Sequence, residues 1–162
     1  MEYLQIVLLI FFLIVFHEIG HIIFAMLLNL AIQKIGFQFN PYPHFYVAVK
    51  WPKNKWQKYL YLFSGSFITI ILFYIAVINN FFGLISLYWA FLIQFTIETN
   101  PFYSDFTIAI VNSNKFDYKI KSYAKNYNLQ FKKYQFTLKW YIHFIIWTLL
   151  IFLLIKFKNQ IL

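Results

Sequence analysis

The first thirty residues constrain the fold most, because they form an apolar run that is interrupted by ionisable side chains. From about Tyr3 to Ile32 the residues are mainly aliphatic and aromatic, but the stretch VFHEIGHIIF contains His17, Glu18 and His21. A helix needs roughly 20 apolar residues to cross a bilayer core of about 30 Å. The run is therefore predicted to be a membrane span that carries three ionisable groups within the membrane.

The composition also favours a membrane protein. Hydrophobic residues make up 62% of the 162 residues and charged residues 12%, whereas about 25% of a typical soluble domain is charged. Cysteine is absent, which excludes disulfides and thiolate metal sites. We attribute the net charge of +9 to lysines at the cytoplasmic ends of spans. We therefore expect an integral protein of a bacterial-type plasma membrane, in contact with the lipid bilayer and without a nucleic-acid partner.

Four apolar segments predict an all-α membrane fold for a single domain that covers residues 1–162. The third segment is interrupted at ETNPFYSDF, so a broken helix is expected there. Five lysines lie in the loop 33–58 and seven in the loop 113–139. Since lysine-rich loops face the cytoplasm, both loops are predicted to be cytoplasmic and both termini to lie outside. The predicted spans are about 3–32, 59–78, 81–111 and 140–157.

The loop after the first span, IGFQFNPYPHFYVAVKW, is predicted to be more than a linker. Pro41 and Pro43 block a helix, and FYVAVKW has the β-branched and aromatic composition of a strand. A short strand or a re-entrant loop is expected here. The segment 115–139 interleaves lysine with aromatic residues, which is typical of a surface that rests on anionic lipid.

The histidines match the H-E-x-x-H pattern of zinc hydrolases. Residues four apart on an α-helix are separated by about 40° around its axis, so His17 and His21 place both imidazoles on one face. Glu18 lies on the flank of that face, where it can take a proton from a water at the metal rather than bind the metal. An ionised carboxylate at the bilayer centre costs roughly 3 kcal/mol, which a metal ion and a water-filled cavity would offset. We therefore predict a Zn²⁺ site.

The third metal ligand is expected near the break in the third span, because a catalytic zinc usually takes three protein ligands. The acids there are Glu98 and Asp105. Pro101 disfavours helix at Asn100, so residues 99–105 are expected to be irregular and to line a cavity. Glu98 falls in the last turn of a helix, whereas irregular backbone can turn Asp105 toward the histidines. We favour Asp105.

Together these motifs resemble the site-2 protease family of intramembrane zinc metalloproteases. The resemblance covers roughly residues 10–112 and depends on HEIGH in the first span, YLFSGSFIT in the next and NPFYSDF in the third. It implies that Asp105 is a zinc ligand beside His17 and His21, and that Asn100 helps to hold the substrate or the oxyanion. Three positions depart from the family pattern: Ser66 where proline often follows Gly65, Thr69 in the place of an asparagine, and Phe106 where glycine usually follows the aspartate.

The function that the resemblance implies is hydrolysis of a peptide bond within or near the transmembrane segment of a single-span membrane protein or membrane peptide. Residues 99–105 are then expected to pair with the extended substrate by strand addition. Two alternatives stay open: a membrane haem or metal-binding protein that also uses His143, and a catalytically silent relative that acts by binding, such as an immunity protein. His44 and His143 are expected to be hydrogen-bonding residues, and Glu98 is a candidate for an acid that supports the metal ligands. The sequence leaves the substrate and the oligomeric state open.

Overall fold

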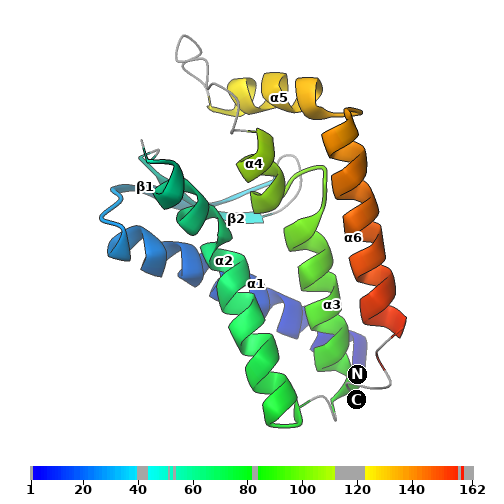
Figure 1. Cartoon of the computed structure of the whole chain (residues 1–162). Coiled ribbons are helices and arrows are strands. Elements are labelled where there is room, and N and C mark those ends of the chain that lie inside the picture. The colour runs from blue at the N-terminus through cyan, green and yellow to red at the C-terminus, as the bar shows by residue number, and fades with distance from the viewer. Residues whose placement is uncertain are drawn as a thin grey trace. The chain divides into compact units, whose positions relative to one another are not determined.

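The computed structural model describes residues 2–39, 44–50, 52, 54–81, 84–111, 123–156 and 158. It forms two compact units, Met1–Phe95 with Lys158–Leu162 and Thr96–Phe157. The first unit holds a long helix, a β-hairpin, a second long helix and most of a third, and the second unit holds the end of that helix and three more (Figure 1). The elements are α1 (Glu2–Leu27), β1 (Ile32–Gln38), β2 (His44–Val49), α2 (Lys55–Ile78), α3 (Ile85–Thr99), α4 (Asp105–Val111), α5 (Tyr123–Tyr134) and α6 (Leu138–Lys156).

Helix α1 ends at Leu27, so the prediction that the first span reaches Ile32 is wrong by more than a turn. Asn29 has a φ of 53°, in the left-handed region that asparagine tolerates better than most residues. The N–H groups of Asn29 and the residue after it donate to the carbonyls of Met26 (3.1 Å) and Ala25 (2.8 Å). This is a Schellman motif, which satisfies carbonyls at the helix end and turns the chain away.

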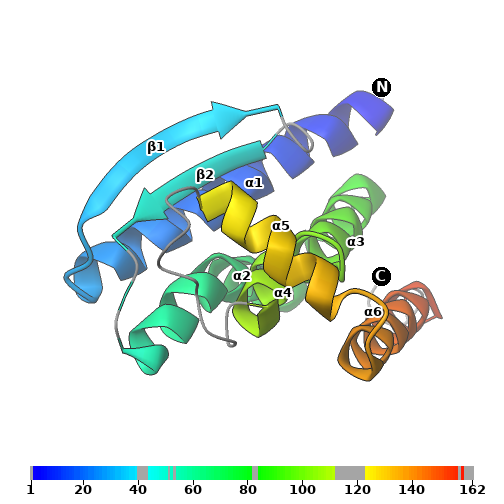
Figure 2. The same ribbon diagram turned by 90° about the horizontal axis from the view of Figure 1, so that it is seen from above.

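The chain after α1 forms a two-stranded antiparallel sheet (Figure 2). Strand β2 confirms the strand predicted from FYVAVKW, whereas β1 was expected to be the end of the span or a loop. Strand β2 packs on α1 and buries Val47 and Val49, while the side chains of β1 are largely exposed. The hairpin therefore lies along α1 and covers one side of it.

Helix α2 starts at Lys55, about one turn before the predicted start at Tyr59, because Asn54 caps it. Asn54 Oδ1 accepts a hydrogen bond from the N–H of Trp56 at 2.9 Å, as is usual for a helix N-cap. The helix ends at Ile78, as predicted. The cap thus adds a turn that hydropathy alone did not indicate.

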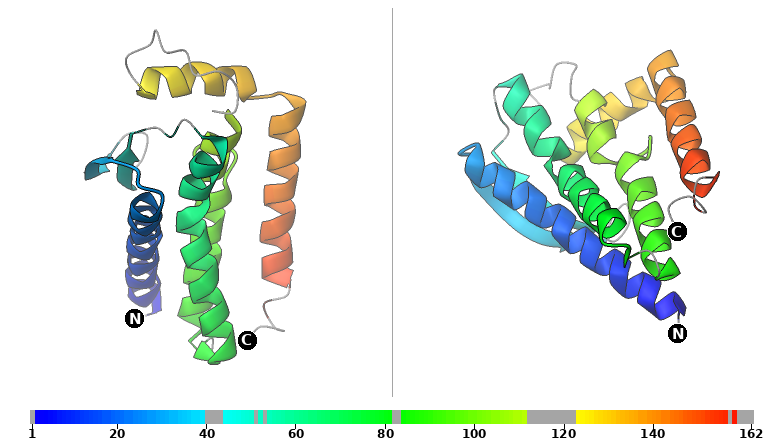
Figure 3. Two further views of the ribbon diagram at one scale, coloured as in Figure 1. Left: turned by 60° about the vertical axis from the view of Figure 1, so that its left-hand side comes forward. Right: turned by 60° about the horizontal axis from the view of Figure 1, so that its bottom comes forward.

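Helices α1 and α2 cross in close contact (Figure 3). A Cβ added to Gly20 would lie 2.7 Å from the Ser64 carbonyl oxygen and 3.1 Å from the Cα of Gly65. Only residues without a side chain permit this approach of two helix backbones. The crossing brings the middle of α2 against the H-E-x-x-H turn of α1.

The core of the first unit lies among the N-terminal half of α1, the C-terminal half of α2 and helix α3. Its buried members include Leu13, Ala76, Tyr88 and Phe91. The Phe73 ring packs edge to face against Phe91, with ring centroids 5.4 Å apart. Such aromatic pairs hold the three helices together by dispersion and by their quadrupoles.

The predicted third span is divided, as the sequence indicated. Helix α3 ends at Thr99 and α4 begins at Asp105, with irregular chain between them. The start of α3 lies at Ile85 rather than near Phe81, because the chain is still turning after α2, where Asn80 has a φ of 57°.

In the second unit, α5 and α6 meet at a sharp corner, with α5 lying across the start of α6 (Figure 1). Thr137 caps α6, since its Oγ1 accepts from the N–H of Trp140 at 3.4 Å and donates to the Tyr134 carbonyl at 2.6 Å. Helix α5 falls in the segment that was predicted to rest on lipid. Residues 115–122 of that segment lie outside the described part of the chain.

Three of the described helices, α1, α2 and α6, are long and apolar enough to cross a membrane. Helix α3 has 15 residues and α4 has 7, so each is shorter than the roughly 20 residues that a straight span needs. Three of the four predicted spans therefore correspond to helices of sufficient length and apolar composition. The predicted third span corresponds to two shorter helices, α3 and α4, with irregular chain between them.

Candidate metal centre

His17 and His21 lie one turn apart on the same face of α1, as predicted. Their Nε2 atoms are 3.2 Å apart, and their rings meet edge to face with centroids 4.9 Å apart. Both side chains are buried, at 8% and 5% exposure. Two imidazole nitrogens therefore converge inside an otherwise apolar helix.

The backbone of α2 holds the ring of His21. Its Nδ1 lies 2.9 Å from the Tyr61 carbonyl oxygen. Since a carbonyl only accepts, Nδ1 carries the proton, and the neutral ring has its lone pair on Nε2. Ser64 Oγ lies 3.1 Å from the same Nδ1 and donates to the Tyr61 carbonyl at 2.6 Å. These contacts fix the tautomer and the ring direction that a metal-binding histidine needs.

The spacing of the two Nε2 atoms fits a single tetrahedral metal ion. With Zn–N distances of about 2.0–2.1 Å, two nitrogens on one tetrahedral zinc are about 3.3 Å apart, close to the 3.2 Å between His17 and His21. Imidazole is also a ligand that zinc favours. The pair therefore meets the ligand type and the spacing of a zinc site.

Gly65 makes room for the ring of His17, because a Cβ added at this position would overlap the imidazole. Nearby, Thr69 is fully buried and donates to the Gly65 carbonyl at 3.3 Å. In the sequence, both positions belong to the departures from the family pattern. In the structure, the ring of His17 packs against Gly65, and the Thr69 hydroxyl bonds to a carbonyl of its own helix.

Glu18 is half-buried on α1 beside the histidine pair. Around the helix axis it lies about 100° from His17 and about 60° from His21. It therefore flanks the histidine face, as predicted, in a position compatible with a proton acceptor.

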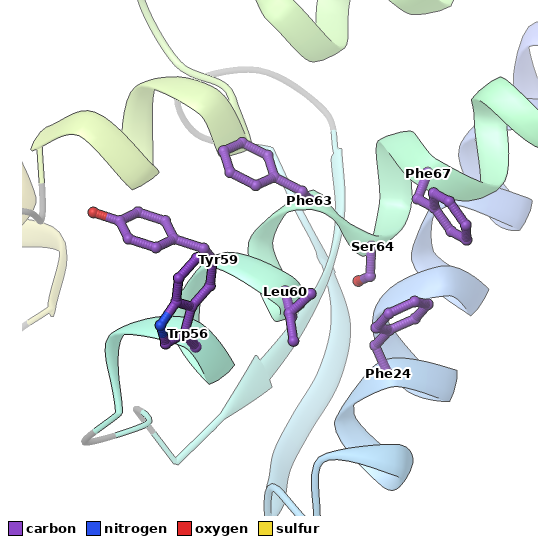
Figure 4. A pocket seen from close by; sticks show the side chains of 7 residues that line it. All are labelled: Phe24, Trp56, Tyr59, Leu60, Phe63, Ser64 and Phe67. Carbon is purple, nitrogen blue, oxygen red and sulfur yellow. The ribbon is translucent and has the colours of Figure 1, made fainter.

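An apolar groove of about 580 Å³ lies on the α1–α2 face next to this site (Figure 4). Its lining includes Ser64, whose hydroxyl contacts His21. The surroundings of the His21 anchor are thus aromatic and aliphatic rather than polar. The lining residues are Phe24, Trp56, Tyr59, Leu60, Phe63, Ser64 and Phe67.

In the second unit, Asn100 organises the break between α3 and α4. Its Oδ1 accepts from the N–H groups of Phe102 (3.0 Å) and Tyr103 (2.8 Å), and its Nδ2 donates to the carbonyls of Ile97 (2.5 Å) and Tyr103 (2.9 Å). Pro101 has no N–H to offer the Ile97 carbonyl, and the Asn100 amide supplies the missing donor. Both amide hydrogens are engaged in holding the break, and a contact of Asn100 with substrate or oxyanion stays a prediction.

Asp105 is the first residue of α4. Ser104 caps this helix, since its Oγ accepts from the N–H of Thr107 at 3.2 Å and its carbonyl from the N–H of Ile108 at 2.8 Å. The prediction of irregular backbone at Asp105 is therefore wrong, because the cap ends the irregular segment at residue 104. A carboxylate in a first turn is also favoured by the helix dipole. Asp105 belongs to the second unit, and its role as a third ligand remains a prediction.

His143 uses both ring nitrogens within the second unit. Its Nε2 donates to the Thr99 carbonyl at 2.9 Å, which leaves Nδ1 to accept from the Tyr134 hydroxyl at 3.0 Å. The indole N–H of Trp147 donates to the Thr96 carbonyl at 3.1 Å. These side chains tie α6 to carbonyls in the last turn of α3. His143 is therefore a hydrogen-bonding histidine, as predicted.

Glu98 lies in the last turn of α3, as predicted, and only 5% of it is exposed. His44, the first residue of β2, is half-buried, and its ring lies 6.3 Å from that of Tyr46. The predicted roles of Glu98, as an acid that supports the metal ligands, and of His44, as a hydrogen-bonding residue, stay predictions.

The sequence did not indicate the two groups that orient His21, the Tyr61 carbonyl and the Ser64 hydroxyl. Both lie about forty residues from the histidine along the chain. The stretch SGS within an apolar helix does signal close contact between helices. It does not say which atom will face which ring.

No protein-family model, curated protein or solved structure matches the chain. The class of protein is therefore inferred from the molecule itself, a helical protein with paired histidines in its longest apolar helix. The likeness to site-2 proteases is a likeness of motifs.

Proposed function

We propose that this protein is an intramembrane zinc metalloprotease of the site-2 protease type. Its substrate would be a single-span membrane protein or membrane peptide, cut within or near the transmembrane segment. One observation carries the proposal. The Nε2 atoms of His17 and His21 are 3.2 Å apart within a 26-residue apolar helix, and the Tyr61 carbonyl fixes the tautomer of His21. The spacing is that of two ligands on one tetrahedral ion. A carbonyl anchor alone would not distinguish a ligand from a structural histidine, since His143 is anchored in the same way.

The membrane part of the proposal is supported by α1, α2 and α6, which have the length and composition of spans. In the proposed topology, α3, the break and α4 make the third of four crossings, and α6 makes the last. Backbone groups at membrane depth must find partners within the protein, and Asn100 supplies four such hydrogen bonds at the break. The lysine-rich loops would face the cytoplasm and the termini would lie outside.

The proposed metal ligands are His17, His21 and Asp105. Spacing and burial support the histidines. Asp105 is supported by the motif NPFYSDF and by its place directly after the break. Its short side chain also loses less rotamer freedom on ligation than a glutamate would. When bound, Zn²⁺ supplies a Lewis acid that makes water an effective nucleophile near neutral pH.

Glu18 is proposed to be the general base. It takes a proton from water as the water oxygen bonds to the substrate carbonyl carbon, and it returns a proton to the leaving amine as the C–N bond breaks. The substrate must be locally extended, because helical carbonyls are engaged in hydrogen bonds. Strand addition at the break is disfavoured, since the N–H groups of Phe102 and Tyr103 already bond to Asn100.

Of the two alternatives, the haem protein is disfavoured, because His143 would have to give up a hydrogen bond to act as a ligand. A catalytically silent relative is favoured by one feature, Phe106 in the position of the family's usual glycine. The silent protein and the protease differ in a measurable respect, since the silent protein would hold zinc without cleaving any substrate.

Substitution of Glu18 tests the proposed function. The purified variant Glu18→Gln is expected to keep its zinc, measured by mass spectrometry of the metal, but to cleave single-span substrates at least about 100-fold more slowly. Loss of zinc together with activity would make Glu18 a ligand instead of the base. A wild-type protein that holds zinc and cleaves none of a panel of single-span substrates would favour the silent alternative.

A matched pair of variants tests the third ligand in the same assays. Asp105→Ala is expected to lower zinc occupancy sharply and to abolish cleavage, whereas Glu98→Gln keeps most of the zinc and changes turnover or stability. The reverse result would assign the ligand to Glu98 and show that the motif NPFYSDF is misleading.

A further inference from the structure

The corner between α5 and α6 is built on an unusual residue. Three non-glycine residues of the described chain have a positive φ: Asn29 (53°), Asn80 (57°) and Phe136 (61°). Asparagine tolerates the left-handed region, but a bulky aromatic residue there is an outlier. Strained backbone of this kind persists only where the surrounding structure holds it, and it gathers at functional positions.

Burial within the protein does not account for Phe136. Its ring touches Trp140, with centroids 5.2 Å apart, yet 65% of the residue is exposed. Leu138, at the start of α6, is 76% exposed. The corner therefore presents two large apolar side chains outward at a point where the chain could have used asparagine and a polar residue.

Lysines flank these apolar side chains in the sequence. Lys132 and Lys133 lie in the last turn of α5 and Lys139 in the first turn of α6, and all three are exposed. The chain contains no Asp or Glu after Asp117, so no acid in this part of the sequence offsets their charge. The helix dipole disfavours a cation in a first turn, which makes Lys139 costly without an external anion.

A hydrogen bond links the end of α5 to α6. The Tyr134 hydroxyl, at the end of α5, bonds to His143 of α6 at 3.0 Å. Helix α5 consequently lies across the start of α6 instead of continuing its direction (Figure 3). If α6 crosses the bilayer, α5 runs along the membrane surface and the corner lies at the level of the lipid headgroups.

We infer that the α5–α6 corner, formed by Lys132, Lys133, Phe136, Leu138 and Lys139, docks on an anionic phospholipid surface. The lysines bind headgroup phosphates, and Phe136 and Leu138 insert at the boundary with the acyl chains. The combination of apolar insertion and basic charge is what holds interfacial segments on anionic membranes. The inference rests on the membrane-spanning part of the proposed function and is independent of zinc and of proteolysis.

Fluorescence quenching in nanodiscs of phosphatidylcholine tests this inference. Because the chain has no cysteine, a bimane label can be placed on Asn128→Cys, at an exposed position of α5. Trace nitroxide-labelled phosphatidylglycerol is expected to quench it at least about fivefold more efficiently than labelled phosphatidylcholine, since each lysine near an anionic surface is worth about that factor. The preference should disappear in a protein that carries Lys132→Gln, Lys133→Gln and Lys139→Gln.

A label at Ile78→Cys is the control, because this exposed position ends α2 in a stretch without lysine from residue 59 to 114. It should show no lipid preference. Equal quenching of the α5 label by both lipids, or a preference that survives the lysine substitutions, would overturn the inference. A preference abolished by inorganic phosphate would point to a small-anion site and would overturn the assignment to a lipid surface.

The variant Phe136→Asn distinguishes insertion of the Phe136 ring into the membrane from its effect on folding. It should be at least as stable in detergent as the wild type, because asparagine fits the left-handed backbone. In phosphatidylglycerol-containing nanodiscs the α5 label should then emit at longer wavelength, as it moves toward water. An unchanged emission spectrum would show that Phe136 does not insert.

Discussion

His21 and His143 are anchored alike but differ in what their second nitrogen does. Each has one ring nitrogen 2.9 Å from a backbone carbonyl that is forty or more residues away in sequence, Tyr61 for His21 and Thr99 for His143. The remaining nitrogen of His143 accepts from the Tyr134 hydroxyl. That of His21 faces the Nε2 of His17.

The difference shows how to distinguish a structural histidine from a ligand. A structural histidine inside an apolar region must satisfy both nitrogens within the protein, because an unmade buried hydrogen bond is costly. A histidine that binds a metal has one nitrogen anchored and the other directed to a point where a second donor also converges. His143 meets the first description. The His17–His21 pair has the geometry of the second, with two Nε2 atoms 3.2 Å apart, and without an ion a hydrogen bond joins these two atoms.

The largest expected effect is a loss of zinc affinity on substitution of His21, which substitution of His143 should not cause. His21→Gln should weaken zinc binding by more than about 100-fold, the upper range for loss of a group that merely supports a ligand. His143→Gln should leave zinc affinity unchanged and lower the free energy of unfolding by about 1–3 kcal/mol through broken hydrogen bonds. Zinc titration against a competing chelator measures the first quantity and denaturation in detergent the second. Equal zinc loss in both variants would contradict the comparison.

A smaller loss of zinc affinity is expected when a group that orients His21 is removed. Ser64→Ala removes a hydroxyl that contacts His21 Nδ1 and the Tyr61 carbonyl, and should weaken zinc binding by about tenfold. Ser66→Ala is the matched control, because Ser66 is also buried in α2, and its Oγ has no hydrogen-bond partner among the described residues. Its zinc affinity should equal that of the wild type. If both serine variants bind zinc as the wild type does, the hydroxyl does not orient the ring.

The contrast also shows what a sequence can predict. Hydropathy located α1, α2 and α6, Pro101 located the break, and the four-residue spacing placed both histidines on one face. Each of these features depends on neighbours within a turn or on the length of an apolar run. Because these features are local, local sequence patterns are sufficient to predict them.

Features that depend on distant contacts were missed. The Tyr61 carbonyl meets His21 only because Gly20 and Gly65 let two helices cross closely. The hydrogen bonds of the Asn100 amide were missed as well, although their partners lie within three residues. They depend on the break at Pro101, which leaves the Ile97 carbonyl without its helical donor. No periodicity of the sequence encodes such pairings, which arise when the chain satisfies its buried polar groups in three dimensions.

The smallest expected effect concerns the hydroxyl that completes the bonds of His143. Tyr134 is 7% exposed, and burial raises the pKa of its hydroxyl above the usual value of about 10. In the folded protein the hydroxyl therefore stays protonated at a pH where the unfolded chain ionises. The resulting stability is complete below about pH 10 and is lost as the pH rises from there through the pKa of the folded state.

Tyr134→Phe should consequently cost about 1 kcal/mol at neutral pH, the worth of one hydrogen bond, and should leave zinc affinity unchanged. The deficit relative to the wild type should shrink above about pH 10, because the variant has no hydroxyl whose ionisation favours the unfolded chain. Unfolding in detergent at a series of pH values measures this difference. A deficit that stayed constant across that range would mean that the Tyr134 hydroxyl ionises alike in both states, so that burial does not raise its pKa.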